Sequence, residues 1–129
     1  MIIKVASSNF ETARSIDDFL KNASVAAGTI LFHHGRVKLP GKTNPAMTHI
    51  RLEAQIPEPV KALEQIARSA KTRFGLLNIM IIHRIGLAFP KDDIMLAGVC
   101  TPERTSAFSA LKWIVDEIKT EKIIRLIEE

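Results

Sequence analysis

The sequence predicts an α+β domain whose sheet is mainly antiparallel. Three observations support this class: six short apolar or alternating segments typical of strands, three segments with helical spacing, and the order β-α-β-β-α-β-β-α-β, in which strands often follow one another directly. With 47% hydrophobic and 25% charged residues, the composition is that of an ordinary globular protein. We therefore expect residues 1–129 to form a single domain.

Six segments show the patterns of strands. Residues 47–55 alternate between apolar and polar side chains, whereas residues 76–82 form an almost continuous apolar run typical of a buried strand. The six predicted strands are Ile2–Ala6, 28–38, 47–55, 76–82, 94–100 and 123–127. Residues 39–45 contain two prolines and a glycine, which predicts a loop and a candidate mobile segment.

Two helices are predicted in the first half of the chain. The first covers residues 15–22, and the second opens at Pro57 and Pro59 and stops at Gly75. Their apolar residues recur every three or four positions, as one buried face of a helix requires. The predicted buried residues are Ile16, Phe19 and Leu20 in the first helix, and Val60, Leu63, Ile66, Ala67, Ala70 and Phe74 in the second.

A third helix is predicted to begin near Thr101. Thr101 suits the N-cap, Pro102 the first helical position, and Glu103 the first turn, where a negative charge is favourable. The residues predicted to be buried on this helix are Phe108, Leu111, Ile114, Val115 and Ile118.

Arg104 and Lys119 bracket this third helix. Arg104 lies in the first turn, where a positive charge is unfavourable unless it and the helix N-terminus both face an anion. A continuous helix separates the two residues by about 22 Å, so one small-molecule pocket in one subunit does not easily contact both. Either they serve different sites, or a two-fold dimer brings Arg104 of one copy beside Lys119 of the other.

The remaining composition excludes several classes of protein. A net charge of +4 favours anionic partners in general, but no run of Lys and Arg with interleaved aromatic residues points to nucleic acid. An RNA-binding α+β domain is disfavoured for the same lack of stacking aromatics. The segment 76–89 is too short and too polar to cross a membrane, and no secretory signal is apparent. We expect a cytoplasmic protein.

Cysteine and histidine give no sign of a metal site. Cys100, the only cysteine, lies in an apolar strand and is expected to be an inert buried thiol. His33 and His34 are adjacent on a strand and should point to opposite faces, while His49 and His83 lie on other strands without ligand spacing. Structural histidines are the simpler interpretation.

Several motifs, taken in order, resemble one enzyme family. They are Gly28-Thr29 with Gly35-Arg36-Val37-Lys38, Leu52-Glu53, His83-Arg84-Ile85-Gly86, Arg104-Thr105-Ser106-Ala107-Phe108, and Lys119-Thr120. Their order and spacing resemble the large, catalytic subunit of molybdopterin synthase, a MoaE-like family also called molybdopterin converting factor subunit 2. The resemblance covers most of the chain.

This resemblance implies an α/β hammerhead-type fold with three helices, assembled as a homodimer. Each copy would bind one ubiquitin-like small subunit, giving a heterotetramer, and the Gly-Gly thiocarboxylate tail of that subunit would donate sulfur. The substrate would be cyclic pyranopterin monophosphate and the product molybdopterin, so that the enzyme is a sulfurtransferase of molybdenum cofactor biosynthesis. No bound cofactor, metal, nucleic acid or membrane is implied.

The resemblance also assigns site residues. Lys119 would be the catalytic lysine. The substrate-binding residues would be Arg36, Val37, Lys38, Glu103, Arg104, Arg125, Leu126, Ile127 and Glu128. Cations at such positions suit the chemistry, because a phosphate and a thiocarboxylate repel each other unless positive charge gathers them.

Three departures from the family pattern leave a second hypothesis open. Lys38 stands where the family has arginine, Glu103 where it has histidine, and Leu126 where it has a second active-site lysine. Arg125 is a candidate substitute for that lysine, but neighbouring strand residues face opposite ways, so it would need a register change. The alternative function is therefore a non-catalytic homologue that binds the small subunit as a scaffold.

Overall fold

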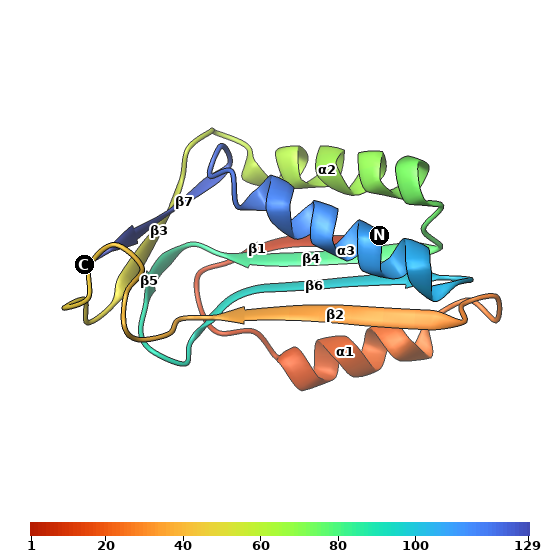
Figure 1. Cartoon of the computed structure of the whole chain (residues 1–129), viewed down its shortest axis with the longest axis horizontal. Helices are drawn as coiled ribbons and strands as arrows, with labels where there is room; N and C mark the ends of the chain where they lie inside the picture. Colours follow the sequence, from red (N-terminus) through yellow and green to blue (C-terminus); the bar gives the residue numbers. More distant parts are fainter.

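The computed structural model describes residues 1–129, which form two sheets and three helices (Figure 1). The larger sheet has the strand order β1-β4-β6-β2. Its strands are β1 (Ile2–Ala6), β4 (Asn78–Arg84), β6 (Asp93–Thr101) and β2 (Thr29–Arg36). Only β1 and β4 are parallel, so the predicted α+β class with a mainly antiparallel sheet is confirmed.

The smaller sheet lies beyond one end of the larger one. It has the order β5-β3-β7, with both pairs antiparallel. Its strands are β5 (Gly86–Ala88), β3 (Ile50–Ala54) and β7 (Ile124–Glu128). The sequence did not predict β5, because its three residues continue the apolar run of β4 and only the positive φ of 91° at Gly86 separates the two strands.

Two helices cover one face of the larger sheet and one helix covers the other. α2 (Pro59–Phe74) and α3 (Arg104–Ile118) lie on the first face, and α1 (Thr12–Lys21) lies on the second (Figure 1). α2 ends where predicted, with Gly75 in the left-handed region at φ 65°. α1 begins three residues earlier than predicted.

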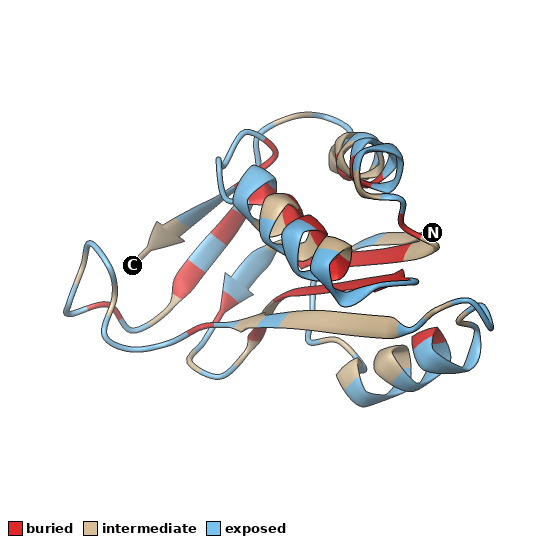
Figure 2. Ribbon diagram, turned by 45° about the vertical axis from the view of Figure 1, so that its right-hand side comes forward, coloured by how far each residue is buried: buried red, intermediate tan, exposed pale blue.

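Buried side chains concentrate on β4, β6 and the inner faces of α2 and α3 (Figure 2). The main core joins these helices to both sheets, and a second cluster places Phe19 of α1 against Met80 and Leu96. Phe19 also packs edge-on against Phe32, with ring centroids 5.6 Å apart.

The predicted start of α3 at Thr101 and Pro102 and the predicted burial of Phe108 were wrong. Thr101 is the last residue of β6, and its hydroxyl donates to the carbonyl oxygen of Glu103 at 2.5 Å, so Glu103 and not Thr101 is the N-cap. Phe108 is 62% exposed, because Ala107, Ala110 and the two isoleucines at 114 and 118 form the face that packs on the sheet. Small alanines let the helix approach the sheet closely and turn Phe108 outward.

No helix of the structure has the length and apolar character that a membrane crossing requires. Cys100 is buried as expected, and burial raises the pKa of its thiol.

Candidate functional site

A cavity of about 430 Å³ opens where the two sheets meet; we call it the junction cavity. The C-terminal end of β2 and the following loop form one wall, and β3 with β7 form another. The C-terminal end of α3 closes the third side. The lining residues are His33, Gly35, Arg36, Val37, Lys38, Pro40, Lys42, Met47, Ile50, Leu52, His83, Ile94, Met95, Ile118, Lys119, Glu121, Ile124, Leu126 and Glu128.

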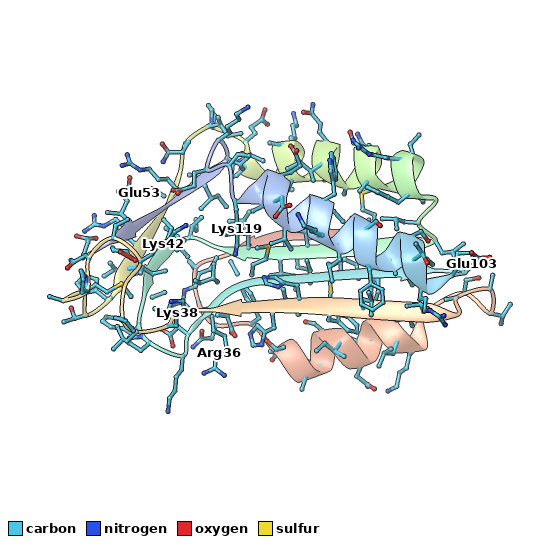
Figure 3. The ribbon with its side chains drawn as sticks, viewed as in Figure 1. Arg36, Lys38, Lys42, Glu53, Glu103 and Lys119 are labelled. Atoms are coloured by element: carbon cyan, nitrogen blue, oxygen red, sulfur yellow. The ribbon has the colours of Figure 1, made fainter.

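Four of the lining residues are cations without counter-ions. Arg36, Lys38, Lys42 and Lys119 form no ion pair and no side-chain hydrogen bond in the structure, although eight ion pairs occur elsewhere. Figure 3 shows all four in the half of the molecule that carries the smaller sheet, and Glu103 at the far end of the other half. Because these four cations outnumber the two glutamates that also line the cavity, its net charge is positive and favours anions.

The two acidic residues of the cavity accept hydrogen bonds from backbone N–H groups. Glu121 accepts a hydrogen bond from the backbone N–H of Leu126 at 2.9 Å. Glu128 accepts hydrogen bonds from the backbone N–H groups of Lys42, Thr43 and Asn44 at 2.6–2.7 Å, and from the Thr43 hydroxyl at 2.7 Å. These bonds, that of the Thr43 side chain first, lower the pKa of Glu128 to about 2.

The Glu128 contacts also fix the loop predicted to be mobile. Residues 39–45 contain no helix or strand, as predicted, and the carboxylate of Glu128 anchors their centre to β7. The loop therefore forms a wall of the junction cavity, to which it contributes Pro40 and Lys42.

Two histidines line the cavity and two do not. His33 has a buried Nε2 without a hydrogen-bond partner, and burial, together with the charges of Lys119 and His34, lowers its pKa. His83 is 4% exposed, and its Nδ1 donates to the carbonyl oxygen of Arg84 at 2.8 Å. His34 faces away from the cavity and contacts Asp93 at 2.6 Å, as strand alternation predicts.

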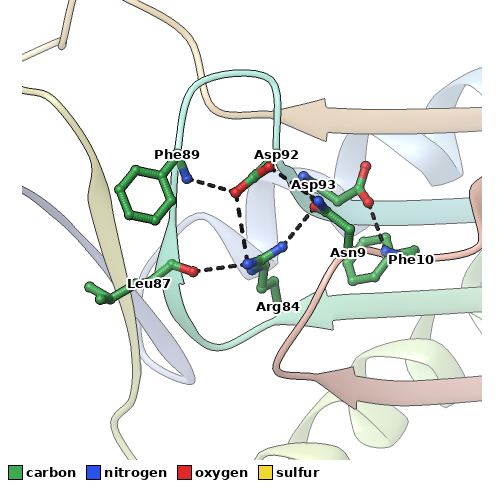
Figure 4. Close-up of polar contacts among 7 residues, drawn as sticks. All are labelled: Asn9, Phe10, Arg84, Leu87, Phe89, Asp92 and Asp93. Carbon is green, nitrogen blue, oxygen red and sulfur yellow. Dashed lines mark hydrogen bonds and ion pairs between the residues drawn. The ribbon is translucent and has the colours of Figure 1, made fainter.

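Arg84, the second residue of the His83-Arg84-Ile85-Gly86 motif, connects segments of the fold by hydrogen bonds and does not line the cavity (Figure 4). Its side chain, only 9% exposed, donates to Asn9 Oδ1 at 2.7 Å and to the carbonyl oxygen of Leu87 at 2.9 Å. Asn9 Oδ1 also accepts from the backbone N–H of Asp93, and Asp92 lies 3.9 Å from the guanidinium. Arg84 thus ties the segment after β1 to the turn between β5 and β6.

The structure brings together some of the residues that the sequence proposed for the site. Lys119 caps the C-terminus of α3 and lines the cavity together with Arg36, Val37, Lys38, Leu126 and Glu128. Arg125 and Ile127 do not line it, because they alternate with Leu126 and Glu128 along β7. Glu103 and Arg104 lie at the opposite end of α3 (Figure 3).

Sequence reasoning missed Lys42, His33 and Glu121 as lining residues. Lys42 lies in an irregular loop, where no periodicity predicts the direction of a side chain. The sequence could have identified His33, because it lies two residues before Gly35 on β2. Residues two apart on a strand share one face, and both of these residues line the cavity.

A second, shallower groove runs between α3 and β2. Its lining includes Leu31, Phe32, Leu111 and the exposed Phe108. β2 is an edge strand of the larger sheet, so one side of its backbone lacks a neighbouring strand. An exposed aromatic residue beside a free edge is typical of a contact surface.

Comparison with known proteins relates the chain to one protein family. The family model "MoaE protein" matches residues 5–121. The molybdopterin synthase catalytic subunit of Yersinia pestis is 42% identical over 60 residues, which are 46% of this chain and 40% of that relative. The chain thus matches less than half the length of this relative. The Vibrio cholerae subunit is 28% identical over 118 residues, 92% of this chain and 77% of its own.

Solved structures share the fold. The molybdopterin synthase structure from Staphylococcus aureus has a TM-score of 0.82 at 24% identity, covering 98% of this chain and 91% of that chain. A complex of subunits 1 and 2 of the molybdopterin-converting factor from Helicobacter pylori 26695 has a TM-score of 0.73 at 14% identity, covering 99% and 84%. These likenesses confirm the fold expected from the sequence. The family match over residues 5–121 confirms the resemblance, and the chain belongs to the MoaE protein family.

Proposed function

We propose that this chain is the catalytic subunit of a molybdopterin synthase. It converts cyclic pyranopterin monophosphate to molybdopterin with sulfur from the thiocarboxylated Gly-Gly tail of a ubiquitin-like small subunit. The observation that carries this proposal is the position of Lys119, which shares one cavity with three further cations and has no counter-ion. The proposal places the protein in the cytoplasm, where a lone cysteine stays reduced.

The cavity suits a reaction between two anions. A phosphate and a thiocarboxylate repel each other in water, and Lys38 and Lys119 reduce this repulsion when both reactants bind beside them. The backbone N–H of Lys119 donates to the carbonyl oxygen of Val115 at 3.0 Å, which continues the helix up to this residue. A lysine on such a frame holds the tail in place and stabilises charge that develops during sulfur transfer.

The positions of Glu103 and Arg104 fit a site shared between two copies. α3 carries Arg104 at its first residue and is followed directly by Lys119, so one subunit holds these groups about 22 Å apart. A two-fold axis across the groove between α3 and β2 would bring Arg104 of the partner subunit toward Lys119. Phe108 lines that groove and would be covered in such a dimer.

Reconstitution tests the proposed function. The purified chain is mixed with a thiocarboxylated small subunit and cyclic pyranopterin monophosphate, and dithiolene formation is followed over time. Multiple turnovers are expected. Tight binding of the small subunit without dithiolene would refute the proposal in favour of the scaffold function, which Leu126 and Glu103 suggest.

A further inference from the structure

The loop between β2 and β3 is built around the carboxylate of Glu128. Three consecutive backbone N–H groups, those of Lys42, Thr43 and Asn44, point at this carboxylate together with the Thr43 hydroxyl. Gly41 permits the turn, because a Cβ there would lie 2.2 Å from the carbonyl oxygen of Asn44 and 2.9 Å from Glu128 Oε1. The conformation of the loop therefore depends on Glu128 and on the absence of a side chain at position 41.

This arrangement sets the position of Lys42. Its backbone N–H donates directly to Glu128 Oε2 at 2.6 Å, and its side chain lines the junction cavity. Figure 3 shows Lys42 in the same half of the molecule as Lys38 and Lys119. A lysine that served only solubility would not need its backbone anchored from a distant strand.

The charges around Lys42 are not balanced within the protein. Glu128 and Glu121, the acidic residues of the cavity, already accept backbone hydrogen bonds, and no lining cation pairs with either of them. The wall formed by β7 contributes the uncharged Leu126. Lys42 therefore lines a cavity in which four cations outnumber two carboxylates, and it forms no ion pair with either carboxylate.

We propose that Lys42 binds an oxyanion of the reactants in the junction cavity, and that Glu128 is a positioning residue that acts by anchoring the backbone of residues 42–44. The inference rests on the proposed function for the identity of those reactants, which carry a phosphate and a C-terminal thiocarboxylate. It assigns to Glu128 a role through the loop, without direct contact with substrate.

Binding of inorganic phosphate to the chain of residues 1–129 tests this inference without requiring turnover. Titration calorimetry at low salt compares the wild type with Lys42→Met, Glu128→Gln, the double variant and Gly41→Ala. Lys71→Met is the matched control. Lys71 is exposed on α2, away from the cavity, so this substitution removes the same charge without changing the site. Thermal unfolding of each variant verifies that it is folded.

Lys42→Met is expected to weaken phosphate binding about tenfold, as the loss of one charge-assisted contact does. Glu128→Gln and Gly41→Ala are expected to weaken binding in the same direction, while Lys71→Met stays within twofold of wild type. The double variant Lys42→Met with Glu128→Gln should match Lys42→Met within twofold, because both changes remove the same contact. If the effects of Lys42→Met and Glu128→Gln multiply in the double variant, the positioning role is overturned. Unchanged phosphate binding in Lys42→Met, or no binding by wild type at about 10 mM phosphate, would overturn the inference.

Steady-state kinetics identifies the anion. A higher KM for cyclic pyranopterin monophosphate alone in Lys42→Met assigns the phosphate, and a higher KM for the small subunit alone assigns the thiocarboxylate tail. Unchanged KM values for both would overturn the inference while leaving the proposed function intact. Phosphate binding that depends on Lys42 in a chain without turnover would support the inference and refute the proposed function.

Discussion

Replacement of Arg84 by methionine should destabilise the protein strongly. Arg84 is one of the few charged residues buried inside the protein, and its stabilising effect comes from its hydrogen bonds. The guanidinium is 9% exposed and donates two hydrogen bonds, to Asn9 Oδ1 at 2.7 Å and to the Leu87 carbonyl at 2.9 Å. Methionine has a similar length but no donor. The variant therefore removes the side-chain donor to the Leu87 carbonyl oxygen and leaves Asn9 Oδ1 with only the backbone N–H of Asp93.

The magnitude follows from these contacts. Each charge-assisted hydrogen bond is worth about 1.5–3 kcal/mol, so the two together contribute about 3–6 kcal/mol. The Nε of Arg84 is buried without a partner, and its removal returns about 1–2 kcal/mol. The ion pair with Asp92 is long, at 3.9 Å, and adds little. We expect a net loss of about 3 kcal/mol in the free energy of unfolding.

Urea denaturation at one fixed protein concentration measures this loss. With a slope of about 2 kcal/mol per molar urea, the midpoint should fall by about 1.5 M. Arg68→Met is the matched control, since the Arg68 side chain is 70% exposed and its pair with Glu64 spans 3.8 Å, so it should cost less than about 0.5 kcal/mol. A loss below about 1 kcal/mol in Arg84→Met, or one equal to that of Arg68→Met, would refute the structural role of the Arg84 network.

Three further predictions concern the site and its surroundings. Because the bonds to the loop lower the pKa of Glu128 from 4.5 to about 2, the stabilisation of the closed loop should be complete above pH 4.5 and lost as the pH falls through about 2. The protection of amides 42–44, taken as the exchange rate relative to an unstructured peptide at the same pH, should therefore be lower near pH 2 than at pH 6, and equal protection at both would contradict this. The pKa of His33 is lowered by burial and by Lys119, so an NMR titration should give a midpoint below 6.5 that rises in Lys119→Ala, and an unchanged midpoint would show that the two groups do not interact. Phe108→Glu places a charge in the groove between α3 and β2 and should convert a dimer to monomer in sedimentation velocity, whereas a variant that sediments like wild type would exclude this surface as the interface.

The sequence predicted the fold where local pattern and tertiary packing agree. Ile2–Ala6 has its predicted bounds, and Gly75 ends α2 because a left-handed residue there is most easily a glycine. Thr101 and Phe108 were misassigned for a tertiary reason. β6 extends through Thr101, and the close packing of Ala107 and Ala110 on the sheet decides which face of α3 is buried.

The candidate site was predictable only where it lies on regular elements. Lys38 lies two residues beyond the end of β2, although it was predicted to be the last residue of that strand, and Lys119 directly follows α3; both line the cavity. Lys42 could not be found in this way, because its position depends on hydrogen bonds to Glu128, 86 residues away in the chain. Arg104 lies on a regular element and was proposed for the site, but within one chain it stands at the opposite end of α3 from Lys119.

The rate of dithiolene formation in a single turnover, measured for wild type and Lys119→Ala with saturating small subunit, tests the central claim most directly. The account predicts a loss of at least about 100-fold in Lys119→Ala, with Lys71→Ala within twofold of wild type. A Lys119→Ala variant that forms dithiolene within threefold of the wild-type rate would contradict the assignment of the junction cavity as the active site.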